Sequence, residues 1–88
     1  MSKKADCLLQ FSYSPNGNGN AAYLPVLRKH CRRHTVINTR SLGDDLNTLE
    51  LSFYVDLRDR EANNEFVRDL RKAAGVARVN LYFDEEVF

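Results

Sequence analysis

Cysteine, proline and glycine are all scarce in this chain, with two, two and four residues among 88. It also lacks any apolar run near the ~20 residues that a membrane-spanning helix needs, so we expect no part of it to cross a membrane. The first four residues carry charge with no apolar segment behind them, which is unlike a secretory signal peptide. We therefore expect a cytoplasmic location.

The chain also has little net charge, because 13 basic residues face 12 acidic ones and leave a balance of +1. That balance argues against a polyanionic partner held mainly by bulk charge. Two cysteines, Cys7 and Cys31, are too few for a disulfide framework. Their predicted places bring them close enough for a bridge, but in the cytoplasm we expect two buried, reduced thiols.

Hydrophobic spacing predicts two strand–helix–strand halves in one domain. The apolar content of 43% is typical of a folded globule. The predicted elements are a strand over 7–13, a helix from about 21 to His34, a strand over 35–42, a strand over 49–57, a helix from Asp59 to Gly75 and a strand over 76–83. We expect residues 6–83 to form the domain, residues 1–5 to be disordered and residues 84–88 to be a frayed acidic tail.

This order of elements predicts an α+β fold, the ferredoxin-like βαββαβ two-layer sandwich. Right-handed crossovers and a short central turn give an antiparallel four-stranded sheet of order 4-1-3-2, with both helices on one face. The strand over 49–57 alternates strictly, so one face of the sheet is expected to be open. In the strand over 35–42, Ile37 and Thr39 are the expected inward pair.

The whole pattern resembles an ACT-type ferredoxin-like domain over nearly all of residues 6–83. The resemblance rests on the glycine-containing loop Ser14-Pro15-Asn16-Gly17, on Val36-Ile37, on the run over 49–57 and on the ending Gly75-Val76-Ala77-Arg78-Val79. The second half also resembles cytosolic C-terminal domains of bacterial inner-membrane proteins of the MgtC/SapB type. These resemblances imply a regulatory, non-enzymatic module, a homodimer, a small amino-acid-like effector, and fusion to or action with a membrane protein.

ACT domains usually hold their effector near the loop after the first strand. The corresponding candidate ligand residues here are Asn16, Gly17, Asn18, Gly19 and Asn20. Glycine permits close approach of the backbone, and a following helix offers free N–H groups to an anion. The acidic residue common before the family's glycine is absent, so a plain flexible connector is the alternative interpretation.

The open face is the second candidate site, and its expected interface residues are Leu8, Gln10, Tyr54 and Tyr82. In the predicted strand order, Tyr54 and Tyr82 flank the first strand. Tyrosines among mixed polar residues are typical of protein interfaces. The alternatives are a solvated sheet and an RNA-binding platform, although Glu50 and Asp56 would repel phosphate and make nucleic acid an unfavoured partner.

Three further patterns indicate chemistry only weakly. The basic run 28–34 could meet anionic lipid, nucleic acid or an acidic partner, but its cations spread around the predicted helix as on a solvated helix end. His30 and His34 are spaced for a shared metal, yet no carboxylate completes a ligand set, so we expect no metal and no cofactor. The loop after the first strand lacks the phosphate-binding arginine of acylphosphatase, and no catalytic constellation is evident, so we expect no enzyme.

Overall fold

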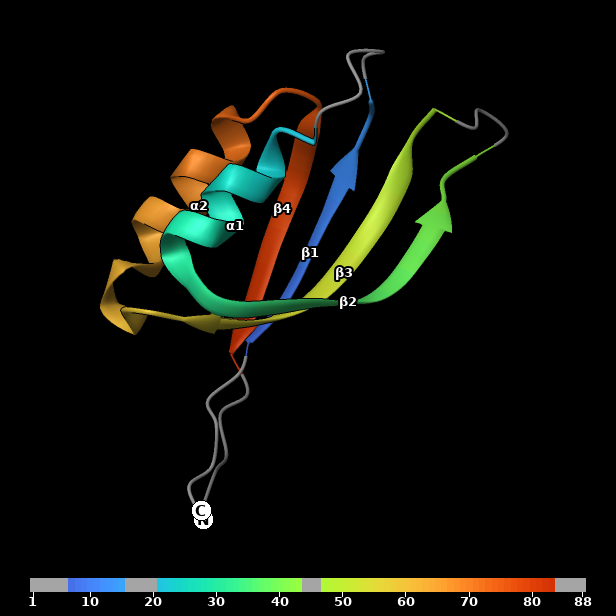
Figure 1. The fold of residues 1–88 in the computed structure, drawn as a ribbon. Coiled ribbons are helices and arrows are strands. Elements are labelled where there is room, and N and C mark those ends of the chain that lie inside the picture. Colours follow the sequence, from blue (N-terminus) through green and yellow to red (C-terminus); the bar gives the residue numbers. More distant parts are fainter. Residues whose placement is uncertain (1–6, 16–20, 44–46, 84–88) are drawn as a thin grey trace.

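The computed structural model describes residues 7–15, 21–43 and 47–83, which form an α+β domain (Figure 1). Its elements are β1 (Cys7–Tyr13), α1 (Tyr23–His30), β2 (Cys31–Ser41), β3 (Leu49–Leu57), a 3₁₀ turn (Arg60–Ala62), α2 (Asn63–Lys72) and β4 (Val76–Phe83). The predicted bounds of the first, third and fourth strands are confirmed.

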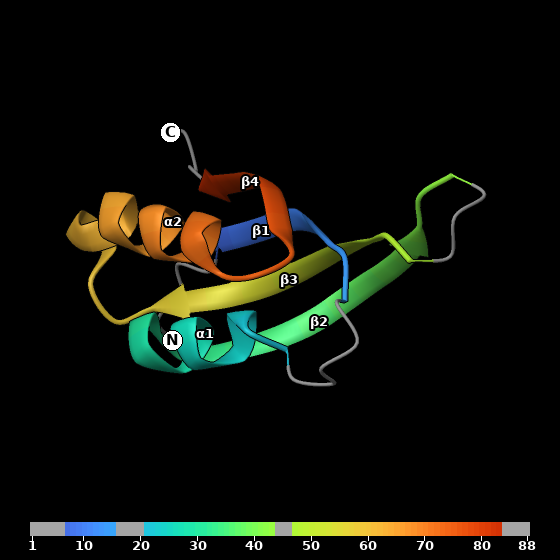
Figure 2. The same cartoon turned by 90° about the horizontal axis from the view of Figure 1, so that it is seen from above.

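The four strands form one open sheet in the order β2-β3-β1-β4, and every neighbouring pair is antiparallel. This is the predicted order 4-1-3-2 counted from the other edge. Both helices lie against one side of this sheet (Figures 1 and 2). We call that side the helix face and the other side the open face.

The core lies between the helices and the helix face. Alternate residues of the two central strands are buried there, as period-two patterning predicts: Cys7, Leu9, Phe11 and Tyr13 from β1, and Leu51, Phe53, Val55 and Leu57 from β3. The helices add Leu27, Phe66 and Leu70, each with no exposed surface. Burial of a leucine or phenylalanine side chain contributes about 1.5–3 kcal/mol, so these contacts hold two otherwise polar helices on the sheet.

The first helix is shorter than predicted, because β2 begins at Cys31 and α1 ends at His30 rather than near His34. Cys31 has extended backbone angles, is 2% exposed and pairs with Leu57 of β3. The backbone N–H of Arg58 donates to the carbonyl of His30, 2.9 Å away. Strand pairing and burial of Cys31 thus outweigh the helical spacing of the basic run.

The second helix also ends early, at Lys72 instead of Gly75. Asp59 does act as an N-cap, accepting from the N–H of Glu61 at 3.0 Å, but it caps the 3₁₀ turn. Gly75 adopts φ +82° in the turn into β4, where its carbonyl accepts from the N–H of Ser14 at 2.9 Å. The prediction of glycine at this turn is right, and the helix stops sooner because Ala73 is already extended.

The predicted inward pair of the second strand is wrong for Ile37, which is 43% exposed. The β2–β3 register shifts between Val36 and Asn38, which places Ile37 at a bulge. Thr39 does lie on the helix face, opposite Leu51, but it is exposed because no helix covers this part of β2.

Among the described residues, neither helix is long and apolar enough to cross a membrane.

Candidate functional site

A row of apolar side chains crosses the open face at its centre. Leu8 of β1 pairs with Tyr54 of β3 on one side and with Tyr82 of β4 on the other. Side chains directly opposite in an antiparallel pair lie about 4.5–5.5 Å apart at Cβ, so the three side chains are neighbours. The tyrosines are 51% and 50% exposed. The prediction that Tyr54 and Tyr82 flank the first strand is confirmed.

The next row of the open face is polar and internally hydrogen-bonded. Gln10 lies between Ser52 and Asn80, and its amide nitrogen donates to the Ser52 hydroxyl at 3.1 Å. Ser52 is only 3% exposed, and Ser12 only 9%, with its hydroxyl donating to the carbonyl of Ala77 at 3.1 Å. Period-two alternation places both serines on this face, but larger neighbours cover them. The two serine side chains therefore lie beneath the surface of the open face and offer little area for contact with a partner.

Charged side chains stand at both ends of the β2–β3 part of the open face and neutralise one another. Arg40 is 2.7 Å from Glu50, and Arg33 is 3.4 Å from Asp56. Both pairs join cross-strand neighbours. Each of these two arginines therefore has a carboxylate partner on the neighbouring strand. The apolar row lies between two ion pairs, so the charges beside it are balanced and not all positive or all negative.

Irregularities interrupt both edges of the sheet. β2 shifts register against β3 twice, between Cys31 and Arg33 and between Val36 and Asn38. β4 shifts register against β1 near Arg78, the one described residue other than glycine with positive φ, at 55°. Bulges of this kind twist an edge away from a regular partner, so the edges are poorly suited to pairing with another strand.

The second candidate, the glycine loop, lies outside the described residues. Asn16, Gly17, Asn18, Gly19 and Asn20 all fall in it. Of its surroundings, the helix that follows begins with Ala22 at the N-cap position, without a side-chain cap. The loop prediction therefore stays a prediction.

The two histidines do not share a helix, because the strand begins between them. His30 ends α1, where its Nε2 lies 2.8 Å from Asp69 of α2 and its ring packs on Phe66. His34 lies on β2, with its ring against Phe53. No group of three or more potential metal ligands occurs within the described part of the chain.

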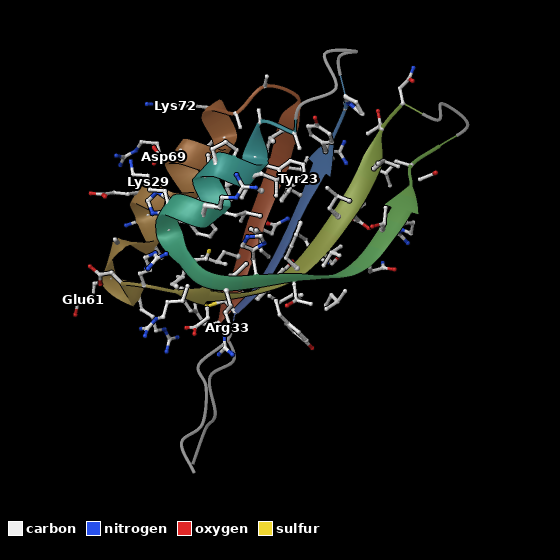
Figure 3. All side chains as sticks on the ribbon, viewed as in Figure 1. Tyr23, Lys29, Arg33, Glu61, Asp69 and Lys72 are labelled. Carbon is white, nitrogen blue, oxygen red and sulfur yellow. The ribbon has the colours of Figure 1, made fainter. Side chains whose placement is uncertain are left out.

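Figure 3 shows Asp69 on the outer side of the helix layer, together with Lys29 and Lys72. The hydrogen bond from His30, reinforced by the nearby charge of Lys29, lowers the pKa of the Asp69 carboxyl. These contacts join α1 to α2. They form a structural link between the helices, on the side away from the open face.

The two cysteine side chains are buried, as expected, and are not joined in a disulfide. Burial, with a smaller effect from the neighbouring Cys7, raises the pKa of the Cys31 thiol to about 12. A thiol with so high a pKa is protonated at neutral pH and is a poor nucleophile.

Apart from Thr39, whose face was predicted, sequence reasoning missed the residues that β2 contributes to each face. Thr35, Asn38 and Arg40 pair with Tyr54, Ser52 and Glu50 on the open face. His34, Val36 and Thr39 pair with buried residues of β3 on the helix face. Simple alternation could not assign them, because each register shift changes the phase of the strand. The residue pattern within 31–41 carries no sign of where those shifts occur.

Comparison of the chain with protein-family models, with curated proteins and with solved structures finds no match.

Proposed function

We propose that this chain is a non-catalytic assembly module of the ferredoxin-like class, which pairs with a second copy of itself through the open face. The observation that carries the proposal is the row Tyr54–Leu8–Tyr82 at the centre of that face, in which both tyrosines are exposed. Tyrosine supplies a large contact area at low entropic cost and is enriched in interfaces. The regulatory role implied by the ACT resemblance would act through this assembly.

The charge distribution supports a second copy as the partner. The two ion pairs leave the β2–β3 part of the face without net charge, and the whole chain carries only +1. Two such faces can approach without like-charge repulsion. The bulged edges favour contact between faces over edge-to-edge pairing of strands.

RNA binding through the same face is the second candidate, favoured by the two exposed tyrosines on which bases could stack. The ion pairs argue against RNA binding. Glu50 and Asp56 already form ion pairs with the nearby arginines, which leaves few cations on this face to bind phosphate. Filter binding of a single-stranded RNA at low salt tests this alternative. Retention that is lost in Tyr54→Ala and Tyr82→Ala would favour RNA over self-association.

Sedimentation-equilibrium measurements over a concentration series test the assembly. We expect the native chain to form a dimer and Tyr54→Ser with Tyr82→Ser to weaken it by at least about 2 kcal/mol, the usual size of an interface hot spot. Val36→Ser is the matched control, because Val36 is 52% exposed but lies on the other face. A monomer at every concentration, or equal weakening by Val36→Ser, would overturn the proposal.

A further inference from the structure

A groove lies on the helix face where α1 leaves the sheet uncovered. α1 has only eight residues, and β2 and β3 continue beyond its first turn (Figure 2). The groove has a volume of about 410 Å³. Its floor includes the register partners Val36 and Phe53, and Tyr23 of α1 lines it on the helix side (Figure 3). Small-molecule sites typically have volumes of about 300–1,000 Å³.

The aromatic residues of this groove are fixed by their neighbours. The ring of Tyr23 lies 5.1 Å from that of Phe11, 4.9 Å from that of Tyr13 and 6.0 Å from that of Phe53. The ring of His34 stands edge-on to Phe53 at 6.3 Å. Rings held in place before binding cost a ligand little ordering entropy, which is the condition for tight binding of a small molecule.

The polar groups of the groove are few and available. The Tyr23 and Thr39 hydroxyls and the His34 imidazole all belong to lining residues. None of these three side chains has a hydrogen-bond partner among the residues that the structure describes. No lysine, arginine, aspartate or glutamate of the described ranges lines the groove. A groove with hydrogen-bonding groups but no acidic or basic side chain of these four types favours a polar ligand without a formal charge.

The exposure of Val36 is a further reason to expect that a ligand binds in the groove. It projects on the same face as the core, opposite the buried Phe53, yet it is 52% exposed. An apolar side chain at that position is left in water unless something covers it.

We propose that this groove binds a small, uncharged heteroaromatic molecule. Its ring packs on Val36 and Phe53 beside Tyr23, and its heteroatoms hydrogen-bond to His34 and Thr39. The site lies on the opposite side of the sheet from Tyr54 and Tyr82, so it does not depend on self-association.

Titration with prodan, a neutral naphthalene dye whose emission reports an apolar site, tests the proposal. We expect saturable binding of one dye per chain, and affinity at least about tenfold lower in Val36→Trp, whose indole fills the groove. Ile37→Trp is the matched control, because Ile37 is the next residue of β2 and does not line the groove. Its affinity should stay within about twofold of the native value.

Three results would overturn the proposal. The first is binding to Val36→Trp as tight as to the native chain. The second is loss of dye binding in Tyr54→Ser, which would place the dye on the open face. The third is equal or tighter binding of the anionic naphthalene dye ANS, which would exclude an uncharged class. If Val36→Trp does not fold, amide shifts of the native chain decide: prodan must move Val36 and Thr39 rather than Leu8 and Tyr82.

Discussion

At the scale of single residues, Gly75 has no room for a side chain. A Cβ built there would lie 2.4 Å from the carbonyl oxygen of Ser14, on a backbone with φ +82°. We expect Gly75→Ala to lower the free energy of unfolding by about 2–4 kcal/mol, from the left-handed backbone and the clash together. Urea denaturation followed by circular dichroism measures the change.

Gly43→Ala is the control for that substitution. Gly43 has a similar φ of +69°, but no atom of the described residues lies within 4 Å of the place that an alanine methyl group would take. Only the backbone cost of about 1–2 kcal/mol should remain. Equal losses in the two variants would show that the contact between Gly75 and Ser14 does not constrain the turn.

The Cys31 thiol should be inert while the chain is folded. Its pKa is raised from 9.0 to about 12, chiefly by burial. In a Cys7→Ala variant at mildly alkaline pH, we expect Cys31 to react with a disulfide reagent at least about 100-fold more slowly than in denaturing urea, because labelling requires opening of the structure. Fast labelling without urea would contradict the burial of this thiol.

The same shift fixes the sign of a pH effect. Because the pKa of the Cys31 thiol is raised in the folded state, the contribution of the buried, protonated thiol to the free energy of unfolding is complete below the ordinary pKa of 9.0. The contribution is lost as pH rises from there toward about 12, because the unfolded chain releases the proton first.

At the scale of elements, the link between α1 and α2 predicts a response to acid. The pKa of Asp69 is lowered below 3.8, mainly by the hydrogen bond with His30. Its contribution to stability is therefore present above that value and lost as pH falls through the lower pKa of the folded state. We expect Asp69→Asn to flatten the acid side of the stability curve, measured by urea unfolding at a series of pH values.

Glu65→Gln on the same helix serves as the comparison, since Glu65 makes no ion pair within the described ranges. The free energy of unfolding of Glu65→Gln should fall with decreasing pH in the same way as that of the native chain. An unchanged acid limb in Asp69→Asn would mean that the His30–Asp69 contact is not maintained in solution.

The elements also show how far the sequence could predict this fold. β1, β3 and β4 were predictable to the residue because apolar residues at period two, strict in β3 and looser in β1 and β4, mark a strand with one buried face. The α1–β2 boundary was not, since Leu24, Leu27 and Cys31 fit helical spacing while the pairing of Cys31 with Leu57 is non-local. The groove could not be predicted either, because the register shifts that place its β2 residues depend on the pairing of β2 with β3. The spacing of apolar residues indicates whether a segment is helical or extended on its own. The α1–β2 boundary and the register of β2 depend instead on residues that are distant in the sequence.

At the scale of the whole molecule, the two proposed surfaces lie on opposite sides of one sheet. Tyr54 and Phe53 are consecutive in β3, yet one belongs to the open face and the other to the groove. Substitutions at the two surfaces should therefore be separable: Val36→Trp should leave the dimer intact, and Tyr54→Ser should leave dye affinity unchanged. Weakening of the dimer by Val36→Trp, or loss of dye binding in Tyr54→Ser, would contradict the assignment of the two functions to opposite faces.

The position of β1 has a consequence for biosynthesis. Of the four strands of this sheet, β1 leaves the ribosome before the others, but its two neighbours, β3 and β4, are the third and fourth. Such distant pairings slow folding, because a long loop must close before they form. The row Tyr54–Leu8–Tyr82 cannot assemble until Tyr82 has emerged. A nascent chain should therefore stay monomeric, and partner choice would be made only after β4 has been synthesised.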